Sequence, residues 1–273
     1  MHRLATLPLA FALLGAPQPA AAQSQALRAC ADTGLPVTTT LSVCRRALED
    51  DLSPDQRAAV WVALGVAQAA LGRHREAVGS FGEALAIDPE LVQAYANRAR
   101  SHAAENRLDA AAADFEAALA RDAAQAEIWI GRAAVFLRQD KPRPAIADLT
   151  RAIGLDPDLT AAFYNRGLAY LLAGEAGPAA DDFTTVTERD PEDAGAWLNR
   201  ARARAELGEA AARLDFDRAL RLDPDWGRAW YARGLYLERQ GAREAAEADY
   251  LRAFELGVQD RWLVERVQGL RRN

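Results

Sequence analysis

Large and small apolar residues recur along this chain with a period of about 34 residues, and the spacing inside each period is helical. In the first half of every period a large side chain is followed four positions later by a small one: Trp61 and Gly65, Tyr95 and Ala99, Trp129 and Ala133, Phe163 and Gly167, Trp197 and Ala201, Trp230 and Gly234. In the second half an alanine is followed four positions later by a large residue: Ala77 and Phe81, Ala111 and Phe115, Ala145 and Leu149, Ala179 and Phe183, Ala212 and Phe216, Ala246 and Tyr250. Because residues four apart share one face of a helix, each period predicts two helices that approach closely at the small residues.

Turn signals separate the periods. Asp-Pro pairs stand at four boundaries and Asp122-Ala123 takes the place of a fifth; the pairs are Asp88-Pro89, Asp156-Pro157, Asp190-Pro191 and Asp223-Pro224. Proline lacks the amide hydrogen that a helix interior needs and restricts the residue before it, so each pair ends a helix. These turns define six repeats, the fifth of them one residue short: 58–91, 92–125, 126–159, 160–193, 194–226 and 227–260.

This arrangement resembles the tetratricopeptide repeat family, and the resemblance extends over residues 58–260. A further small position in the second helix supports it: Ala84, Ala118, Ala152, Val186, Ala219 and Ala253. The resemblance implies an all-α fold, a right-handed superhelical solenoid of antiparallel helix pairs. It also implies that a concave groove, lined by the first helices, binds a protein or peptide partner.

Both ends of the chain differ from the repeats. Residues 1–22 carry a short basic start, an apolar run and Ala20 to Ala22 before Gln23, which predicts a secretory signal peptide. The run is too short for a membrane-spanning helix and prolines interrupt it, so we expect a periplasmic or secreted protein with no direct membrane insertion after cleavage. Residues 261–273 alternate apolar and charged side chains and predict a capping helix, which favours a monomer over open-ended stacking.

Only two cysteines are present, Cys30 and Cys44. Cys44 aligns with the aromatic position of the second helices, and Cys30 lies in the short segment before Gly34 and Pro36. In an oxidising compartment we expect a structural disulfide that closes a partial N-terminal repeat over residues 23–57, contributing about 3 kcal/mol for a loop of roughly 15 residues. A redox-active or metal-binding pair is the alternative, but the chain has no Cys-x-x-Cys and its histidines form no cluster. We therefore predict no metal and no cofactor.

Charged residues occupy two repeat positions together. Where the first repeat has Leu64, the next five have Arg98, Arg132, Arg166, Arg200 and Arg233. Where the first repeat has Ser80, the same five have Asp114, Asp148, Asp182, Asp215 and Asp249. The two positions lie at similar heights on antiparallel helices, so we predict structural Arg–Asp ion pairs, either within one repeat or between neighbours.

The resemblance also indicates which side chains face the groove. Three asparagines, at the sixth position of their repeats, offer a donor and an acceptor to a peptide backbone: Asn97, Asn165 and Asn199. Arg100 and Arg202 could receive a carboxylate, and the apolar walls would be Tyr164, Leu168, Leu198, Tyr231 and Leu235. The alternative is that the asparagines bond only to neighbouring helices or to water.

Other functional classes find little support. The net charge of −6 disfavours nucleic acid. The chain has no nucleophile elbow, no phosphate-binding loop and no histidine placed as a triad base, so we predict that it is not an enzyme. The lysines and asparagines with which some family members clamp a chaperone C-terminus are replaced here, except Asn97.

The sequence therefore favours a non-enzymatic scaffold that binds an extended peptide or a helix of a periplasmic or envelope partner in the groove. The alternative is a structural assembly subunit that acts through its convex surface or its ends, in an envelope biogenesis or secretion complex. The choice between groove and convex face, and the identity of the partner, stay open at this point.

Overall fold

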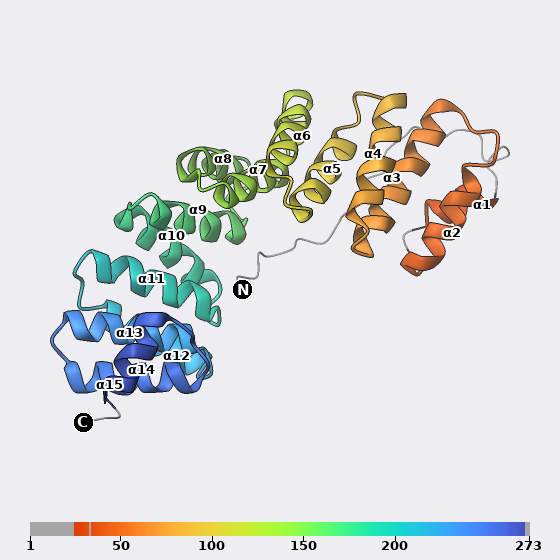
Figure 1. Ribbon diagram of the computed structural model, residues 1–273. Coiled ribbons are helices and arrows are strands. Elements are labelled where there is room, and N and C mark those ends of the chain that lie inside the picture. The colour runs from red at the N-terminus through yellow and green to blue at the C-terminus, as the bar shows by residue number, and fades with distance from the viewer. Residues whose placement is uncertain (1–24, 33, 271–273) are drawn as a thin grey trace. The chain divides into compact units, whose positions relative to one another are not determined.

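The computed structural model describes residues 25–32 and 34–270, and these residues form fifteen α-helices and no strand (Figure 1). The predicted signal peptide and residues 271–273 of the predicted cap lie outside the described residues. The helices are α1 Gln25–Cys30, α2 Val37–Ala47, α3 Pro54–Ala70, α4 His74–Ile87, α5 Val92–Ala104, α6 Leu108–Arg121, α7 Ala126–Arg138, α8 Pro142–Leu155, α9 Thr160–Leu172, α10 Ala176–Arg189, α11 Ala194–Glu206, α12 Ala212–Leu222, α13 Gly227–Arg239, α14 Arg243–Glu255 and α15 Arg261–Leu270.

The chain divides into two compact units, residues 1–141 and 142–273. The first contains α1 to α7 and the second α8 to α15. Within each unit, helices that follow each other along the chain pack together in pairs, as the repeat pattern predicts. The all-α fold built from consecutive helix pairs is therefore confirmed.

A left-handed residue ends the first helix of every repeat. The backbone φ is positive at Gly72, Asn106, Asp140, Gly174, Gly208 and Gly241. In each case the next amide donates to the carbonyl five residues earlier, for example Arg73 N to Gln68 O and Glu175 N to Tyr170 O at 2.9 and 2.8 Å. This Schellman motif satisfies the last carbonyls of the helix, and within one unit it turns the chain so that the second helix runs antiparallel to the first.

The aromatic side chain of the second helix lies directly on the backbone of a first helix. A Cβ atom added at Gly65 would lie 2.7 Å from the Phe81 ring, and one added at Gly167 would lie 2.9 Å from Phe183. The rings of Phe81 and Phe183 are fully buried. Only glycine fits opposite these two rings as they lie, which explains why the sequence has a small residue there.

The N-terminal hairpin is closed by a disulfide between Cys30 of α1 and Cys44 of α2. Both cysteines are buried, and Leu27 and Leu41 pack beside them against Val60 of α3. A six-residue helix such as α1 is too short to be stable alone, so the disulfide and this small apolar cluster hold it.

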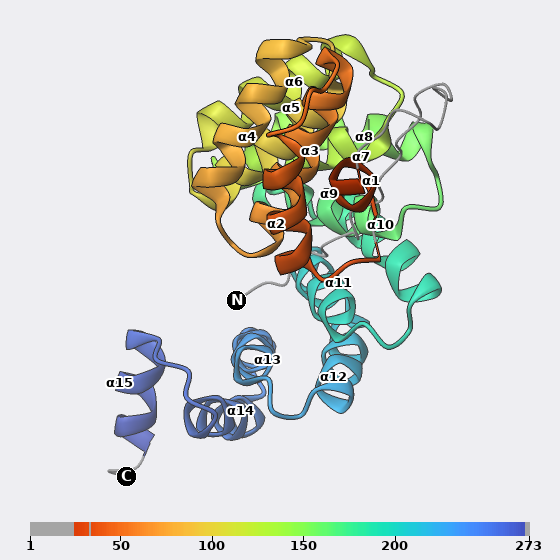
Figure 2. The same cartoon turned by 90° about the vertical axis from the view of Figure 1, so that its right-hand side faces the viewer.

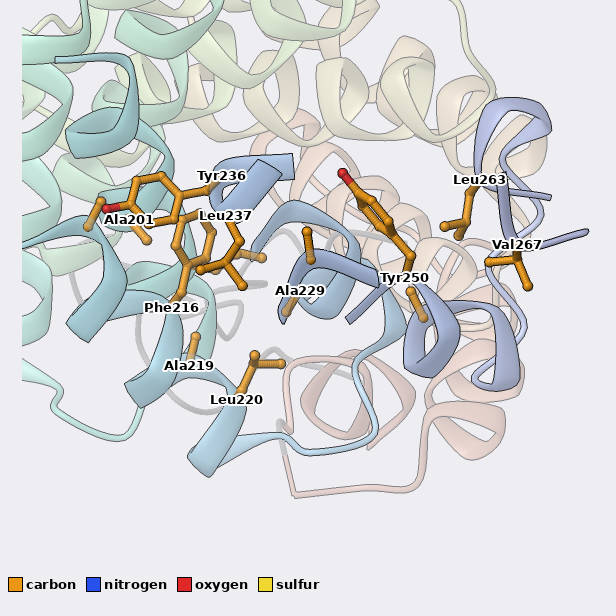
Figure 3. Packing of buried hydrophobic residues seen from close by; sticks show 14 residues of the cluster. Ala201, Phe216, Ala219, Leu220, Ala229, Tyr236, Leu237, Tyr250, Leu263 and Val267 are labelled. Atoms are coloured by element: carbon orange, nitrogen blue, oxygen red, sulfur yellow. The ribbon is translucent and has the colours of Figure 1, made fainter. Parts of the chain in front are cut away.

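At the other end, α15 packs on α14 (Figures 1 and 2). Leu263 and Val267 are fully buried and join the core of the second unit, where Figure 3 shows them together on one side of Tyr250. Asp260 caps the helix by accepting a hydrogen bond from the amide of Leu263 at 3.1 Å. The helix thus covers the apolar side of the last hairpin.

Replacement of both cysteines tests how the N-terminal hairpin is held. In Cys30→Ala/Cys44→Ala we expect the free energy of opening of α1 and α2 to fall by about 3 kcal/mol, because the loop closed by the disulfide becomes free in the open state. Hydrogen exchange of the amides in α1 and α2 measures this change, with α9 and α10 as an internal control. Equal exchange in both proteins would show that apolar packing alone holds α1.

Candidate functional site

Four of the predicted Arg–Asp pairs join the first and second helices of a single repeat. Each arginine donates through Nε and Nη2 to both oxygens of its aspartate, over distances of 2.7–2.8 Å. The pairs are Arg98–Asp114, Arg166–Asp182, Arg200–Asp215 and Arg233–Asp249. The aspartate side chains are at most 10% exposed, so these are shielded bidentate ion pairs. The fifth pair, Arg132 with Asp148, involves one residue from each unit and stays a prediction.

Each of these arginines also lies over the aromatic ring three residues before it. The guanidinium carbon is 4.4 Å from the Trp197 ring centre in the case of Arg200, and 4.8 Å from Trp230 in the case of Arg233. The hydrogen bonds to Asp114 and Asp182 raise the pKa of Arg98 and of Arg166, so both stay charged. Ring and carboxylate together fix the arginine, and through it the rotation of the first helix about its axis.

The first repeat solves the same packing problem with neutral groups. Ser80 donates a hydrogen bond of 2.6 Å to the side-chain oxygen of Gln68, and Leu64 is buried beside them. The repeat pattern predicts the exchange of Ser80 together with Leu64, but Gln68 was not predicted as their partner. The signal was present, because the same repeat position carries His102 and Arg204, which approach Asp114 and Asp215 at 3.7 and 2.8 Å.

Asn199 ties two first helices of the second unit together. Its amide nitrogen donates to the Tyr164 hydroxyl of α9 at 3.1 Å, and its oxygen accepts from Arg202 Nη1 at 3.4 Å. The Asn199 side chain is buried, and burial raises the pKa of Tyr164 to about 12, so the phenol is neutral. At this position the amide serves the neighbouring helices, which was the alternative considered from the sequence.

The other two asparagines are more accessible. Asn165 is partly exposed, and its side chain has no hydrogen-bond partner among the described residues. The oxygen of Asn97 accepts from Arg100 Nη1 at 2.9 Å. Both the donor and the acceptor of the Asn165 amide are thus free for a ligand, whereas the oxygen of Asn97 already accepts a hydrogen bond from Arg100.

The predicted apolar walls are partly used inside the protein. Leu198 is 6% exposed and belongs to the core of the second unit, against which Tyr231 and Leu235 pack. The Tyr231 hydroxyl donates to Asp260 at 3.2 Å, and its ring centre is 6.3 Å from that of Trp262. Leu168 packs beside Tyr164 in a second cluster. Side chains thus link α9 to α11, α11 to α13, and α13 to the start of α15, which itself packs on α14. We call the partly or fully exposed residues along this row the first-helix face of unit 2: Asn165, Leu168, Arg202, Arg228, Tyr231, Leu235, Arg239 and Trp262.

Two further properties bear on function. Within the described ranges 25–32 and 34–270, no three residues among His, Cys, Asp and Glu are grouped to hold a metal ion. No helix in the described part of the chain is long and apolar enough to span a bilayer.

The tetratricopeptide repeat model matches the chain at residues 58–91, and again at 96–142, 130–183, 178–212 and 209–257. The chain belongs to the tetratricopeptide repeat family. The first of these matches has the bounds of the first repeat counted from the turn signals. A search of curated proteins finds no match.

Solved structures of other tetratricopeptide repeat proteins share the fold. YrrB, described as a TPR protein with an unusual peptide-binding site, is 23% identical, with a TM-score of 0.62 over 70% of this chain and 97% of YrrB. The pilF protein of Pseudomonas aeruginosa is 20% identical, with a TM-score of 0.65 over 79% and 98%. PilW, described as a widely conserved type IV pilus biogenesis factor, is 19% identical, with a TM-score of 0.66 over 77% and 98%.

The ion pairs predict a stepwise rescue. Arg166→Leu should lower stability by about 3–5 kcal/mol, because it leaves the buried Asp182 carboxylate without its partner. Adding Asp182→Ser should recover part of the loss, and adding Tyr170→Gln should recover more, because the triple variant reproduces Leu64, Ser80 and Gln68 of the first repeat.

Urea unfolding of the three variants measures the rescue. Arg202→Leu is the matched control, since this arginine has no ion pair among the described residues, and we expect little change. A double variant no more stable than Arg166→Leu would contradict the role assigned to Asp182.

The burial of His102 predicts that the free energy of unfolding depends on pH. The imidazole is 7% exposed and its Nδ1 has no partner among the described residues. Burial, followed by the nearby Arg107, lowers its pKa and outweighs Asp114. The unfolded chain therefore takes up a proton near pH 6.5 and the folded chain only at a lower pH. Stability falls as the pH drops from about 6.5 toward the folded pKa, by at most about 1.4 kcal/mol per pH unit.

Comparison with His102→Gln isolates this effect, because the carboxylates titrate alike in both proteins. We expect the free energy of unfolding of the variant to fall less than that of the wild type between about pH 7 and 5. Parallel curves would mean that His102 has the same pKa in both states.

Proposed function

We propose that this protein is a non-enzymatic scaffold that binds an extended peptide, or a helix, of a partner through its first-helix faces. The observation that carries the proposal is the accessible amide of Asn165, which has no partner among the described residues and lies beside the partly exposed Leu168. One free donor and one free acceptor next to an apolar side chain suit a peptide backbone whatever its sequence.

The three asparagines do not all have the same role in this proposal. Asn199 does not contact the ligand in this proposal; it holds Tyr164 and Arg202, whose positions depend on it. Asn165 then offers the amide, Arg202 the charge, and Leu168 and Leu235 the apolar contacts. In the first unit, Asn97 and Arg100 repeat the same pair.

The comparisons support binding over catalysis. Tetratricopeptide repeat proteins are generally scaffolds, and YrrB is described by its peptide-binding site. PilW is described as a pilus biogenesis factor, and we extend to this chain only the idea of a partner in the cell envelope. The predicted signal peptide and the Cys30–Cys44 disulfide favour a periplasmic or secreted location.

A pull-down with a matched control tests the proposal. The full chain is expressed with its own leader and purified from the periplasm. An intact mass equal to that of a chain beginning at Gln23 would support export. We expect a partner from envelope extract to be retained by the wild type and by Glu188→Gln, an exposed change on the second helix α10, and lost by Asn97→Ala/Asn165→Ala.

Asn199 stays unchanged in this design, since its loss would also release Tyr164. The variants should unfold at the same temperature, so that a loss of binding reflects the face and not the fold. A partner retained by all three proteins would assign the function to the second helices or to the ends of the chain, the assembly role considered from the sequence.

A further inference from the structure

We infer that the peptide bound by unit 2 is acidic and carries a large apolar side chain, and that Trp262 of the last helix α15 receives this side chain. The inference rests on the proposed function and names the class of its ligand. It also gives α15, which the sequence presents only as a cap, a part in the binding site.

The first-helix face of unit 2 continues onto α15. Trp262 is 6.3 Å from Tyr231 and 5.2 Å from Tyr250 between ring centres, so it borders the face on α13. Trp262, Glu265, Arg266, Gly269 and Leu270 share one side of α15 and line a surface depression of about 310 Å³. Gly269 leaves room there, because a Cβ added to it would meet no atom within 4 Å.

The Trp262 ring is more exposed than capping requires. Leu263 and Val267 are fully buried and cover the last hairpin, whereas Trp262 is 42% exposed. A tryptophan held on one side by two tyrosine rings and open on the other loses little entropy on binding, and such residues anchor many protein interfaces.

The charges around the ring are already paired. Arg266 lies 3.4 Å from Glu238 and 3.4 Å from Glu247, and Glu265 lies 3.0 Å from Arg261. An apolar side chain that enters the depression therefore meets charged groups that already have an ion-pair partner, although the buried Nε of Arg266 has no hydrogen-bond partner among the described residues.

In contrast to the charges around Trp262, three arginines of the same face have no carboxylate partner. Arg202, Arg228 and Arg239 are exposed, and none has a carboxylate within 4.0 Å among the residues that the structure describes. On α13, Arg228 and Arg239 share the helix side of Tyr231 and Leu235, and on α11 Arg202 lies one turn after Leu198. Glu206, one turn further, is an acidic residue of that side of α11.

What these three arginines share is their place on one face, beside Tyr231 and Leu235, whereas the four arginines of the ion pairs each hold an aspartate. A ligand with carboxylates would complete their coordination, since a guanidinium binds a carboxylate through two parallel hydrogen bonds. The overall negative charge opposes a nucleic acid or an anionic membrane, which present extended phosphate arrays. An acidic peptide matches the three local arginines, and a short peptide meets mainly these nearby charges, because charges more than about 8–10 Å away are screened at physiological salt.

A displayed library of random twelve-residue segments, fused to a carrier at both ends, tests the inference with the full-length exported protein. Fusion at both ends removes any contribution of a free C-terminus. We expect the enriched segments to combine aspartate or glutamate with phenylalanine, tryptophan or leucine. One enriched segment is then synthesised in three forms: unchanged, with its acidic residues amidated to asparagine or glutamine, and with its large apolar residue replaced by serine.

Fluorescence anisotropy measures the affinity of these peptides and shows which side chains of the protein bind their acidic and apolar residues. Each altered peptide should bind the wild type about tenfold more weakly. Arg202→Gln/Arg228→Gln/Arg239→Gln should abolish the preference for the acidic form and keep the preference for the apolar residue, while Trp262→Ala should do the reverse. Arg243→Gln, an exposed change on α14, is the matched control and should bind like the wild type.

A measurement on the unchanged protein guards against misfolding of the tryptophan variant. In protein labelled with 5-fluorotryptophan, the Trp262 resonance is assigned by its absence in Trp262→Phe and should shift when the peptide binds. An unshifted resonance would overturn the role of Trp262. Enrichment of segments without acidic or apolar bias that bind the wild type but not Asn165→Ala would overturn the inference and leave the proposed function intact, whereas no enrichment at all would overturn both.

Discussion

The close approach of two helices at a small residue is the constraint on which the rest of the molecule depends. Phe81 lies on Gly65, Phe183 on Gly167 and Tyr250 on Gly234, each within 3 Å of where a Cβ would be. Close-packed interiors tolerate neither a gap nor an extra methyl group at such a contact. The hairpins with glycine therefore share this contact, whereas Ala99, Ala133 and Ala201 take the small position in the other repeats, and the left-handed residue that ends each first helix lets the chain return.

Polar groups then determine how each first helix is turned about its axis. The bidentate Arg–Asp pairs and the rings beneath the arginines take up the side of the helix that faces its partner. Breaking such a buried pair costs far more than the pair itself contributes to net stability, and the neutral Gln68–Ser80 bond of the first repeat shows that charge is not required at this contact. What remains on the outer side of the helices is available for binding.

The same side chains explain why the candidate site differs between repeats. Asn165 and Asn199 occupy equivalent positions, yet the neighbour of Asn199 is Tyr164, whose hydroxyl takes its amide hydrogen bond. Asn97 faces no such hydroxyl and holds Arg100 instead. One residue type at one repeat position thus has three roles, because the partner on the preceding helix changes. The aromatic residue of α15 adds a further element to the face of unit 2.

The sequence by itself determined the repeat, the helix pairs and which positions carry charge, since these follow from local spacing and helix periodicity. It could not tell whether Arg166 pairs within its repeat or with a neighbour, because both partners are equally distant along the pattern. Only the tertiary structure decided that, together with the burial of Asn199, the bond between Ser80 and Gln68, and the exposure of Trp262. These depend on side chains from different helices meeting in space, and one helix's periodicity holds no information about the rotamers of the next.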